Sequence, residues 1–358
     1  MLDCRPHFMQ GFSIMRFKSV AQAMAFGMTT MIFGLSMIAM STAYAGEITV
    51  YTALEEPEIA DYLAVARKDM PDLKVNVLRL STGDLGARIL SEGNHPRYDV
   101  IWGWALTNMM DPRVQALLQP YSPKGLDRVP AQFKDPNGKW FAPTGYMAAL
   151  CVNTDRLKLK GLPMPTGWTD LLNPVYKGEV VMPNPASSGT GYLQVVSILQ
   201  GMGGEKGWDF LKQLNANVAQ YSKSGSRPCS MASTGEYAIG ASSAIVAMEA
   251  VRQGYPVKMV IPKEGAGYEL EANALVAGST HQQDAKRFLD WTISDDAARQ
   301  YAKYKEIIGI EIAAEVSKPT SDGMPSDVKK LLFPMDFKQS METRQSTLDR
   351  WQKEIEKH

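Results

Sequence analysis

Cysteine and histidine are scarce in this chain, and their scarcity limits its chemistry. The 358 residues include 3 cysteines and 4 histidines. No H-E-x-x-H or C-x-x-C spacing joins them, so neither a zinc site nor another metal or cofactor site is predicted. No G-x-S-x-G motif is present, so a serine hydrolase of that type has no support. The sequence therefore favours a binding protein over an enzyme.

An excess of charge of one sign is also missing. The chain has 38 basic and 38 acidic side chains. The first 45 residues hold three of the basic residues and one of the acidic ones, which leaves 35 basic and 37 acidic and a net charge of −2 in the remainder. No basic block stands out, so we expect no nucleic-acid partner and no binding to anionic membranes.

The N-terminus has the three parts of a secretory signal peptide. Arg16 and Lys18 precede the uncharged run Ser19–Met40, and the small residues of Ala43-Tyr44-Ala45 follow it. A transmembrane anchor is the alternative, since the run approaches spanning length, but Gly, Ser and Thr dilute it. We expect residues 1–45 to be a signal peptide cleaved after Ala45, and the mature protein to be periplasmic.

Two cysteines, Cys151 and Cys229, remain after this cleavage. In an oxidising compartment two thiols usually pair, and a bridge across 78 positions would contribute about 4 kcal/mol on the chain-entropy model. Two buried free thiols are the alternative.

Strand-like and helix-like segments alternate in two blocks, which predicts a parallel sheet covered by helices. The first block has strands at Ile48–Tyr51, Lys74–Leu80 and Asp99–Trp102, with helices at Glu56–Asp69 and Gly83–Glu92. The second block has strands at Glu179–Met182, Val218–Tyr221, Tyr237–Ala241 and Val257–Ile261, with helices at Gly191–Met202, Glu205–Asn215 and Ala244–Gln253. The 313 residues from Gly46 to His358 are enough for two lobes with separate cores.

Two apolar runs, Tyr146–Asn153 and Glu269–Val276, are suited to crossing between the lobes. We therefore expect a first lobe made of 46–147 and 269–358, and a second lobe of 148–268. The C-terminal helices predicted at Asp284–Ile293, Asp296–Tyr304 and Met341–Glu356 belong to the first lobe in this scheme.

Two loops that follow strands and open helices combine hydroxyls with glycines. They are Ser81-Thr82-Gly83 and the run from Pro185 to Gly191, which contains Ser187, Ser188, Gly189 and Thr190. Helix starts at the carboxyl ends of parallel strands offer N–H groups and partial positive charge to an anion. Simple N-caps are the alternative. We expect the anion to be held by neutral donors without a counter-ion.

Other candidates are less distinctive. Ser242 follows a strand and can add a donor, or belong to a plain polar loop. Glu55 or Glu271 could meet a cationic group, although each could instead pair within the protein. Trp102, at a strand end, could wall off a ligand or simply pack in the core.

At these residues the chain resembles a known family. Val50–Glu56, Ser81–Gly83, Ala149–Thr154 and above all Val181–Gly191 are similar to type II, ferric-binding-like periplasmic proteins of ABC transporters, and most of all to 2-aminoethylphosphonate-binding proteins. One departure is the run Ala241–Ile245, where short side chains replace bulkier family residues.

The resemblance implies a two-lobed α/β fold with a two-crossing hinge and a Cys151–Cys229 disulfide. It implies a monomeric receptor, not an enzyme, that delivers a small phosphonate to an ABC permease in the inner membrane. Ferric iron binding and a secreted phosphoester hydrolase are the alternatives. The expected ligand-binding residues are Leu54, Glu55, Ser81, Thr82, Gly83, Trp102, Ser187, Ser188, Gly189, Thr190, Ser242 and Glu271.

Overall fold

The computed structural model describes residues 46–310 and 330–356, so the predicted signal peptide lies outside the described residues. Within those ranges no helix has the length and apolar character needed to span a membrane. The strands are β1 (Gly46–Thr52), β2 (Leu73–Arg79), β3 (Val100–Ala105), β4 (Leu118–Gln119), β5 (Phe141–Asn153), β6 (Val180–Pro183), β7 (Val218–Ser222), β8 (Ile239–Ser243), β9 (Val257–Val260), β10 (Tyr268–Val276) and β11 (Ile307–Ile308). The α-helices are α1 (Glu56–Asp69), α2 (Thr82–Glu92), α3 (Leu106–Met109), α4 (Pro112–Gln115), α5 (Thr154–Lys160), α6 (Gly189–Met202), α7 (Gly204–Asn215), α8 (Arg227–Ser233), α9 (Ala244–Arg252), α10 (Gln282–Trp291), α11 (Asp295–Tyr301), α12 (Phe337–Glu342) and α13 (Arg344–Trp351).

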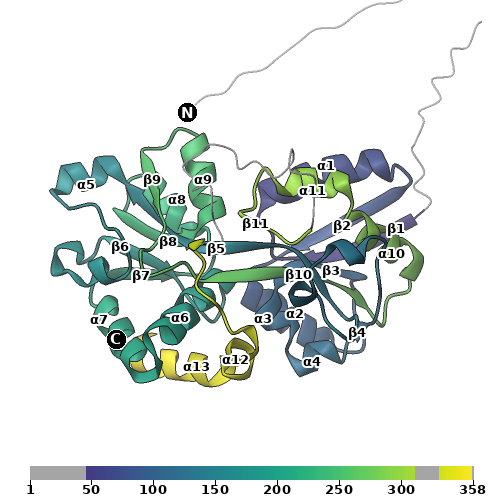
Figure 1. Ribbon diagram of the computed structural model, residues 1–358. Helices are drawn as coiled ribbons and strands as arrows, with labels where there is room; N and C mark the ends of the chain where they lie inside the picture. The colour runs from purple at the N-terminus through teal and green to yellow at the C-terminus, as the bar shows by residue number, and fades with distance from the viewer. Residues whose placement is uncertain (1–45, 311–329, 357–358) are drawn as a thin grey trace, which may run out of the picture. The chain divides into compact units, whose positions relative to one another are not determined.

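The strands form a mixed sheet in the order β2-β1-β3-β10-β5-β8-β6-β7 (Figure 1). At one end β1 is parallel to β2 and β3, and at the other β6 is parallel to β7 and β8. The central strands β10 and β5 run antiparallel to each other and to their outer neighbours β3 and β8. Two parallel blocks joined by two crossing strands are the fold predicted from the sequence, and that prediction is confirmed.

Strand β5 is longer than the predicted crossing at Tyr146–Asn153, because its first residues also have partners. Its N-terminal half pairs with β10, with Tyr146 opposite Glu269. Its C-terminal half pairs with β8, with Ala148 opposite Ser243. All 13 residues of β5 are buried, as expected for a strand that passes between two covered blocks of sheet.

Each block has apolar packing of its own, and we call the blocks the first and second lobes. In the first lobe, Tyr62 of α1 and Phe288 of α10 pack on one face of the sheet, while Leu85 and Ile89 of α2 belong to a cluster with Trp104 of β3. In the second lobe, residues of α6 and α7 pack against β6 and β8, and α8 and α9 contribute to a smaller cluster around the cysteines. The disulfide between Cys151 and Cys229, with Cα atoms 5.2 Å apart, joins β5 to α8.

The C-terminal helix is the element whose predicted place was wrong. We expected one helix at Met341–Glu356 in the first lobe. The structure instead has α12, α13 and a short π-helical turn, and Trp351 and Ile355 pack in the core of the second lobe. The Nζ of Lys212 in α7 lies 2.8 Å from Glu354 Oε2, and this ion pair also joins the C-terminal segment to the second lobe. Helical periodicity identified the apolar face but could not say which lobe covers it.

Candidate functional site

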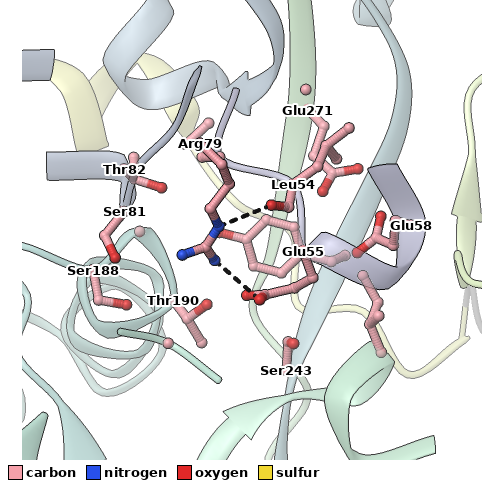
Figure 2. Close-up of a pocket in the computed structure, with 17 residues that line it drawn as sticks. Leu54, Glu55, Glu58, Arg79, Ser81, Thr82, Ser188, Thr190, Ser243 and Glu271 are labelled. Atoms are coloured by element: carbon pink, nitrogen blue, oxygen red, sulfur yellow. Dashed lines mark hydrogen bonds and ion pairs between the residues drawn. The ribbon is translucent and has the colours of Figure 1, made fainter. Parts of the chain in front are cut away.

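A cavity lies where the carboxyl ends of the first-lobe strands meet the start of α6. Figure 2 shows the side chains that line it, drawn from both lobes and from the crossing strands. Eight of the twelve predicted ligand-binding residues line this cavity: Leu54, Glu55, Ser81, Thr82, Ser188, Gly189, Thr190 and Glu271.

The two predicted anion-binding loops meet at this cavity. The Gly83 N–H at the start of α2 donates to the carbonyl of Ser187 at 2.8 Å. A Cβ on Gly189 would lie 2.5 Å from Thr82 Oγ1, so glycine is required for the start of α6 to approach so closely. The two helix starts therefore share one space, as the sequence predicts.

The hydroxyl groups that line the cavity differ in whether they already have a hydrogen-bond partner. Ser188 Oγ accepts the N–H of Gly191 at 3.2 Å, so this serine is a helix cap as well as a lining residue. Ser81 is the N-cap residue of α2 but makes no side-chain cap hydrogen bond. Ser81 and Thr82 can therefore offer their hydroxyl groups to a ligand.

Three other predicted residues, Gly83, Ser187 and Ser242, do not line the cavity. Gly83 is used in the contact between the loops. Ser187 Oγ donates to the carbonyl of Lys223 at 2.9 Å. Ser242 Oγ donates to the carbonyl of Gly225 at 2.7 Å, and it is the adjacent Ser243 that lines the cavity. Ser242 thus holds a lining residue, Gly225, in place.

Trp102 is the fourth predicted residue outside the cavity. It is 1% exposed and its ring meets that of Phe288 edge-on, with centroids 5.3 Å apart. In a regular strand Trp102 and Trp104, two positions apart, would face the same side, but the register between β3 and β10 is irregular here, and the two indoles enter separate core clusters. Gly103, between them, lines the cavity. Its φ is +62°, and a Cβ there would collide with Leu54.

Several lining residues were missed by sequence reasoning. Arg79 is the last residue of β2, where a single charge is also typical of an exposed strand end. Gly225 lies in a serine- and glycine-rich loop between β7 and α8, the same strand–loop–helix pattern as the two recognised loops. The full set of additional lining residues is Ala53, Glu58, Arg79, Gly103, Ala105, Tyr146, Gly225, Ser243 and Ile245.

Arg79 corrects the expectation of an anion site without a cation. Its Nε donates to the carbonyl of Leu54 at 3.1 Å, and its Nη2 to Glu55 Oε2 at 2.9 Å. Burial raises the pKa of Glu55, and the positive charge of Arg79 opposes that rise. The cavity therefore holds an internal ion pair.

A second group of charges lies deeper. The Nζ of Lys305 is ion-paired with Glu58 and, at 2.8 Å, with Glu271. Glu271 Oε2 also accepts the hydroxyl of Thr144 at 2.6 Å. Burial raises the pKa of Glu58 to about 7, an effect that Lys305 opposes. Two of the carboxylates that reach the cavity wall are thus held by one buried lysine.

The donors and charges suit capture of a ligand with an anionic group. Within residues 46–310 and 330–356 there is no cluster of three His, Cys, Asp or Glu side chains that could hold a metal ion. Hydroxyls, N–H groups and a guanidinium line one part of the cavity, and carboxylates line another. This arrangement binds by hydrogen bonds and charge, without requiring a reactive group.

Comparison with known proteins supports a binding role. Residues 107–329 match the family model described as bacterial extracellular solute-binding protein. An uncharacterized protein of Haemophilus influenzae is 32% identical over 295 residues, covering 79% of this chain and 84% of its own. A probable ABC transporter periplasmic-binding protein of Sinorhizobium fredii is 29% identical over 239 residues, which cover 64% of this chain and 65% of that protein.

A solved structure extends the likeness to the fold. The periplasmic binding protein AfuA from Actinobacillus pleuropneumoniae, with exogenous fructose-6-phosphate bound, superposes with a TM-score of 0.80 at 28% identity. The match covers 87% of this chain and 99% of AfuA. These relatives are periplasmic binding proteins, one of them of a probable ABC transporter. The chain belongs to the bacterial extracellular solute-binding protein family.

Proposed function

We propose that this chain captures 2-aminoethylphosphonate, or a closely related small phosphonate, in the cavity between its lobes. The observation that carries the proposal is the opposition of two kinds of lining group in one cavity. Arg79, Thr82 and Thr190 face it with donors, and Glu55 faces it with a carboxylate (Figure 2). A phosphonate and an ammonium on one small molecule match these two kinds of group.

Capture would proceed by hinge closure about β5 and β10. A ligand that contacts Thr82 in the first lobe and Ser188 in the second lobe stabilises the closed arrangement, because both contacts exist only there. The lobe division in this proposal is 46–147 with 269–310 against 148–268 with the C-terminal helices. The closed, monomeric receptor would then meet an ABC permease in the inner membrane.

A phosphorylated sugar is the second candidate. AfuA, at 28% identity, has been solved with fructose-6-phosphate bound. The same hydroxyl and amide donors suit a phosphate ester, and carboxylates accept hydrogen bonds from sugar hydroxyls. The two candidates share the anion-binding groups and differ in what meets Glu55.

Calorimetric titration of the mature protein tests the proposal. We expect micromolar or tighter binding of 2-aminoethylphosphonate, with weaker binding of fructose-6-phosphate and none of ferric citrate. Thr82→Val, which removes one cavity hydroxyl, is expected to weaken binding about tenfold. The matched control is Ser187→Ala, whose hydroxyl points to Lys223 outside the cavity. If fructose-6-phosphate binds more tightly than 2-aminoethylphosphonate, the sugar phosphate is the better candidate ligand. If no phosphonate or phosphate binds, the proposed function is contradicted.

The proposed export of the chain has a separate test. We expect the periplasmic fraction of expressing cells to contain a protein that begins at Gly46, as read by N-terminal sequencing. An intact N-terminus in that fraction would contradict cleavage after Ala45.

A further inference from the structure

Glu55 and Arg79, the two charged groups that the proposed function gives to the ligand, are ion-paired with each other. Both side chains line the cavity, and 30% of Glu55 and 24% of Arg79 remain exposed. Neither is needed to cap a helix, because Glu55 stands at the N-cap of α1 without a side-chain cap hydrogen bond. The pair is therefore within reach of a ligand.

Glu55 is the most exposed of the cavity carboxylates, with a side chain that is 30% exposed and has Arg79 and Ser226 as its neighbours. Glu271 uses one oxygen for Lys305 and the other for Thr144. The side chain of Glu58 is only 2% exposed and is held by Lys305. Of the carboxylates that line the cavity, Glu55 is thus the one that a positively charged group on a ligand can reach.

Arg79 has one guanidinium nitrogen without a partner in the described ranges. Its Nε and Nη2 are used by Leu54 and Glu55. Figure 2 shows the remaining nitrogen pointing toward the side where Ser188 and Thr190 lie. No residue in the described ranges accepts a hydrogen bond from it. An anionic group seated on the start of α6 would meet this nitrogen.

We propose that Glu55 and Arg79 exchange their ion pair for the two ends of a zwitterionic ligand, which makes this pair the determinant of ligand charge. The inference rests on the proposed function and deepens it. In the empty protein each partner neutralises the other. In the complex the anionic end of the ligand takes over Arg79, and the cationic end takes over Glu55.

The exchange explains why a plain anion would be disfavoured. An anion that engages Arg79 competes with Glu55 for the guanidinium charge and leaves a partly buried carboxylate without a full partner, which is costly. A plain cation would leave Arg79 in the converse position. Only a ligand that carries both charges restores both interactions, so discrimination arises from the unpaired partner as well as from new contacts.

Substitution of Glu55 distinguishes this exchange from a structural role. The probes are 2-aminoethylphosphonate and ethylphosphonate, which lacks the amine. We expect Glu55→Gln to raise the Kd for 2-aminoethylphosphonate between about 10- and 100-fold and to lower the Kd for ethylphosphonate, since Arg79 is released for the anion. Glu56→Gln is the matched control, because Glu56 is exposed and does not line the cavity.

A second variant keeps the test decisive. Arg79→Gln is expected to weaken both probes at least tenfold, because the shared anionic end loses its cation. Equal weakening of both probes by Glu55→Gln would overturn the exchange while leaving the receptor function intact. If the unsubstituted protein binds neither phosphonates nor phosphate esters, the receptor function itself fails, a result that differs from the first.

Discussion

Two groups of charged side chains lie near each other in this protein, and they differ in how far a ligand in the cavity can reach them. Lys305 is fully buried, and its two carboxylates, Glu58 and Glu271, reach the cavity wall but are only 2% and 6% exposed. Glu55 and Arg79 have similar chemistry but open onto the cavity. A sealed ion pair is stabilising only as long as every member keeps its partner, whereas an open pair can trade partners at little cost. Access, more than charge, separates a structural group from a binding group here.

Removal of Lys305 is expected to have the largest effect and tests the sealed half of this comparison. Lys305→Met leaves Glu58 and Glu271 buried without their cation, which should lower the free energy of unfolding by about 3–5 kcal/mol. The loss should be greater at pH 8 than at pH 5, because a protonated carboxyl needs no cation. Urea unfolding measures both values. Lys303→Met is the control, since Lys303 is exposed, and a loss below 1 kcal/mol at Lys305 would contradict the structural role.

Glu306 is a third case, a carboxyl group whose two buried oxygens lack a hydrogen-bond partner in the described ranges. Neither of its oxygens has a hydrogen bond within the described ranges, and burial raises the pKa of Glu306 to about 8. The folded protein thus holds a proton there that the unfolded chain releases near pH 4.5, so this group lowers stability as pH rises from about 4.5 to 8. Glu306→Gln should therefore stabilise the protein at pH 8 by on the order of 2 kcal/mol.

The same substitution should have little effect at pH 5, where Glu306 is protonated in the folded state. Thermal unfolding across this pH range measures the difference. Glu236→Gln, at an exposed position, should change stability equally at both pH values. A benefit of Glu306→Gln that did not grow with pH would argue against a sealed, unpaired carboxyl.

A substitution that hinders the proposed closure of the lobes tests the binding role of the cavity. In Gly83→Ala the new Cβ would lie 2.0 Å from the carbonyl oxygen of Ala186, a backbone atom that cannot move aside cheaply. In the proposed hinge closure this contact forms as the lobes come together. We therefore expect ligand affinity to fall about tenfold while the melting temperature of the ligand-free protein changes little. Gly204→Ala, with no atom within 4 Å of its added Cβ, is the control. An unchanged affinity would mean that this contact plays no part in closure.

Much of this architecture could be predicted from periodicity and turn residues. The helix at Glu56–Asp69 was predicted with the bounds that the structure has, because its apolar residues repeat at helical spacing and Pro71 follows it. The strand–loop–helix pattern also identified Ser81, Thr82 and Ser188, since strand ends in a parallel sheet gather at one edge.

What could not be predicted depends on contacts between distant segments. Arg79 looks like any strand-end charge until Leu54 and Glu55 are placed beside it. Trp102 packs in the core and Gly103 lines the cavity instead, because the irregular register of β3 with β10 decides which residue faces the cavity. The place of the C-terminal helix likewise depends on a tertiary contact, that of Trp351 with the second-lobe core.

The Cys151–Cys229 bridge has a consequence for the timing of maturation. It fastens α8, which directly follows the loop that contains Gly225, to the buried strand β5. Thiols stay reduced in the bacterial cytosol and oxidise outside it. A precursor with the proposed leader would therefore lack this clamp until it had crossed the inner membrane. The newly made chain would remain looser and easier to translocate, and its ligand loop would become rigid only where the ligand is found.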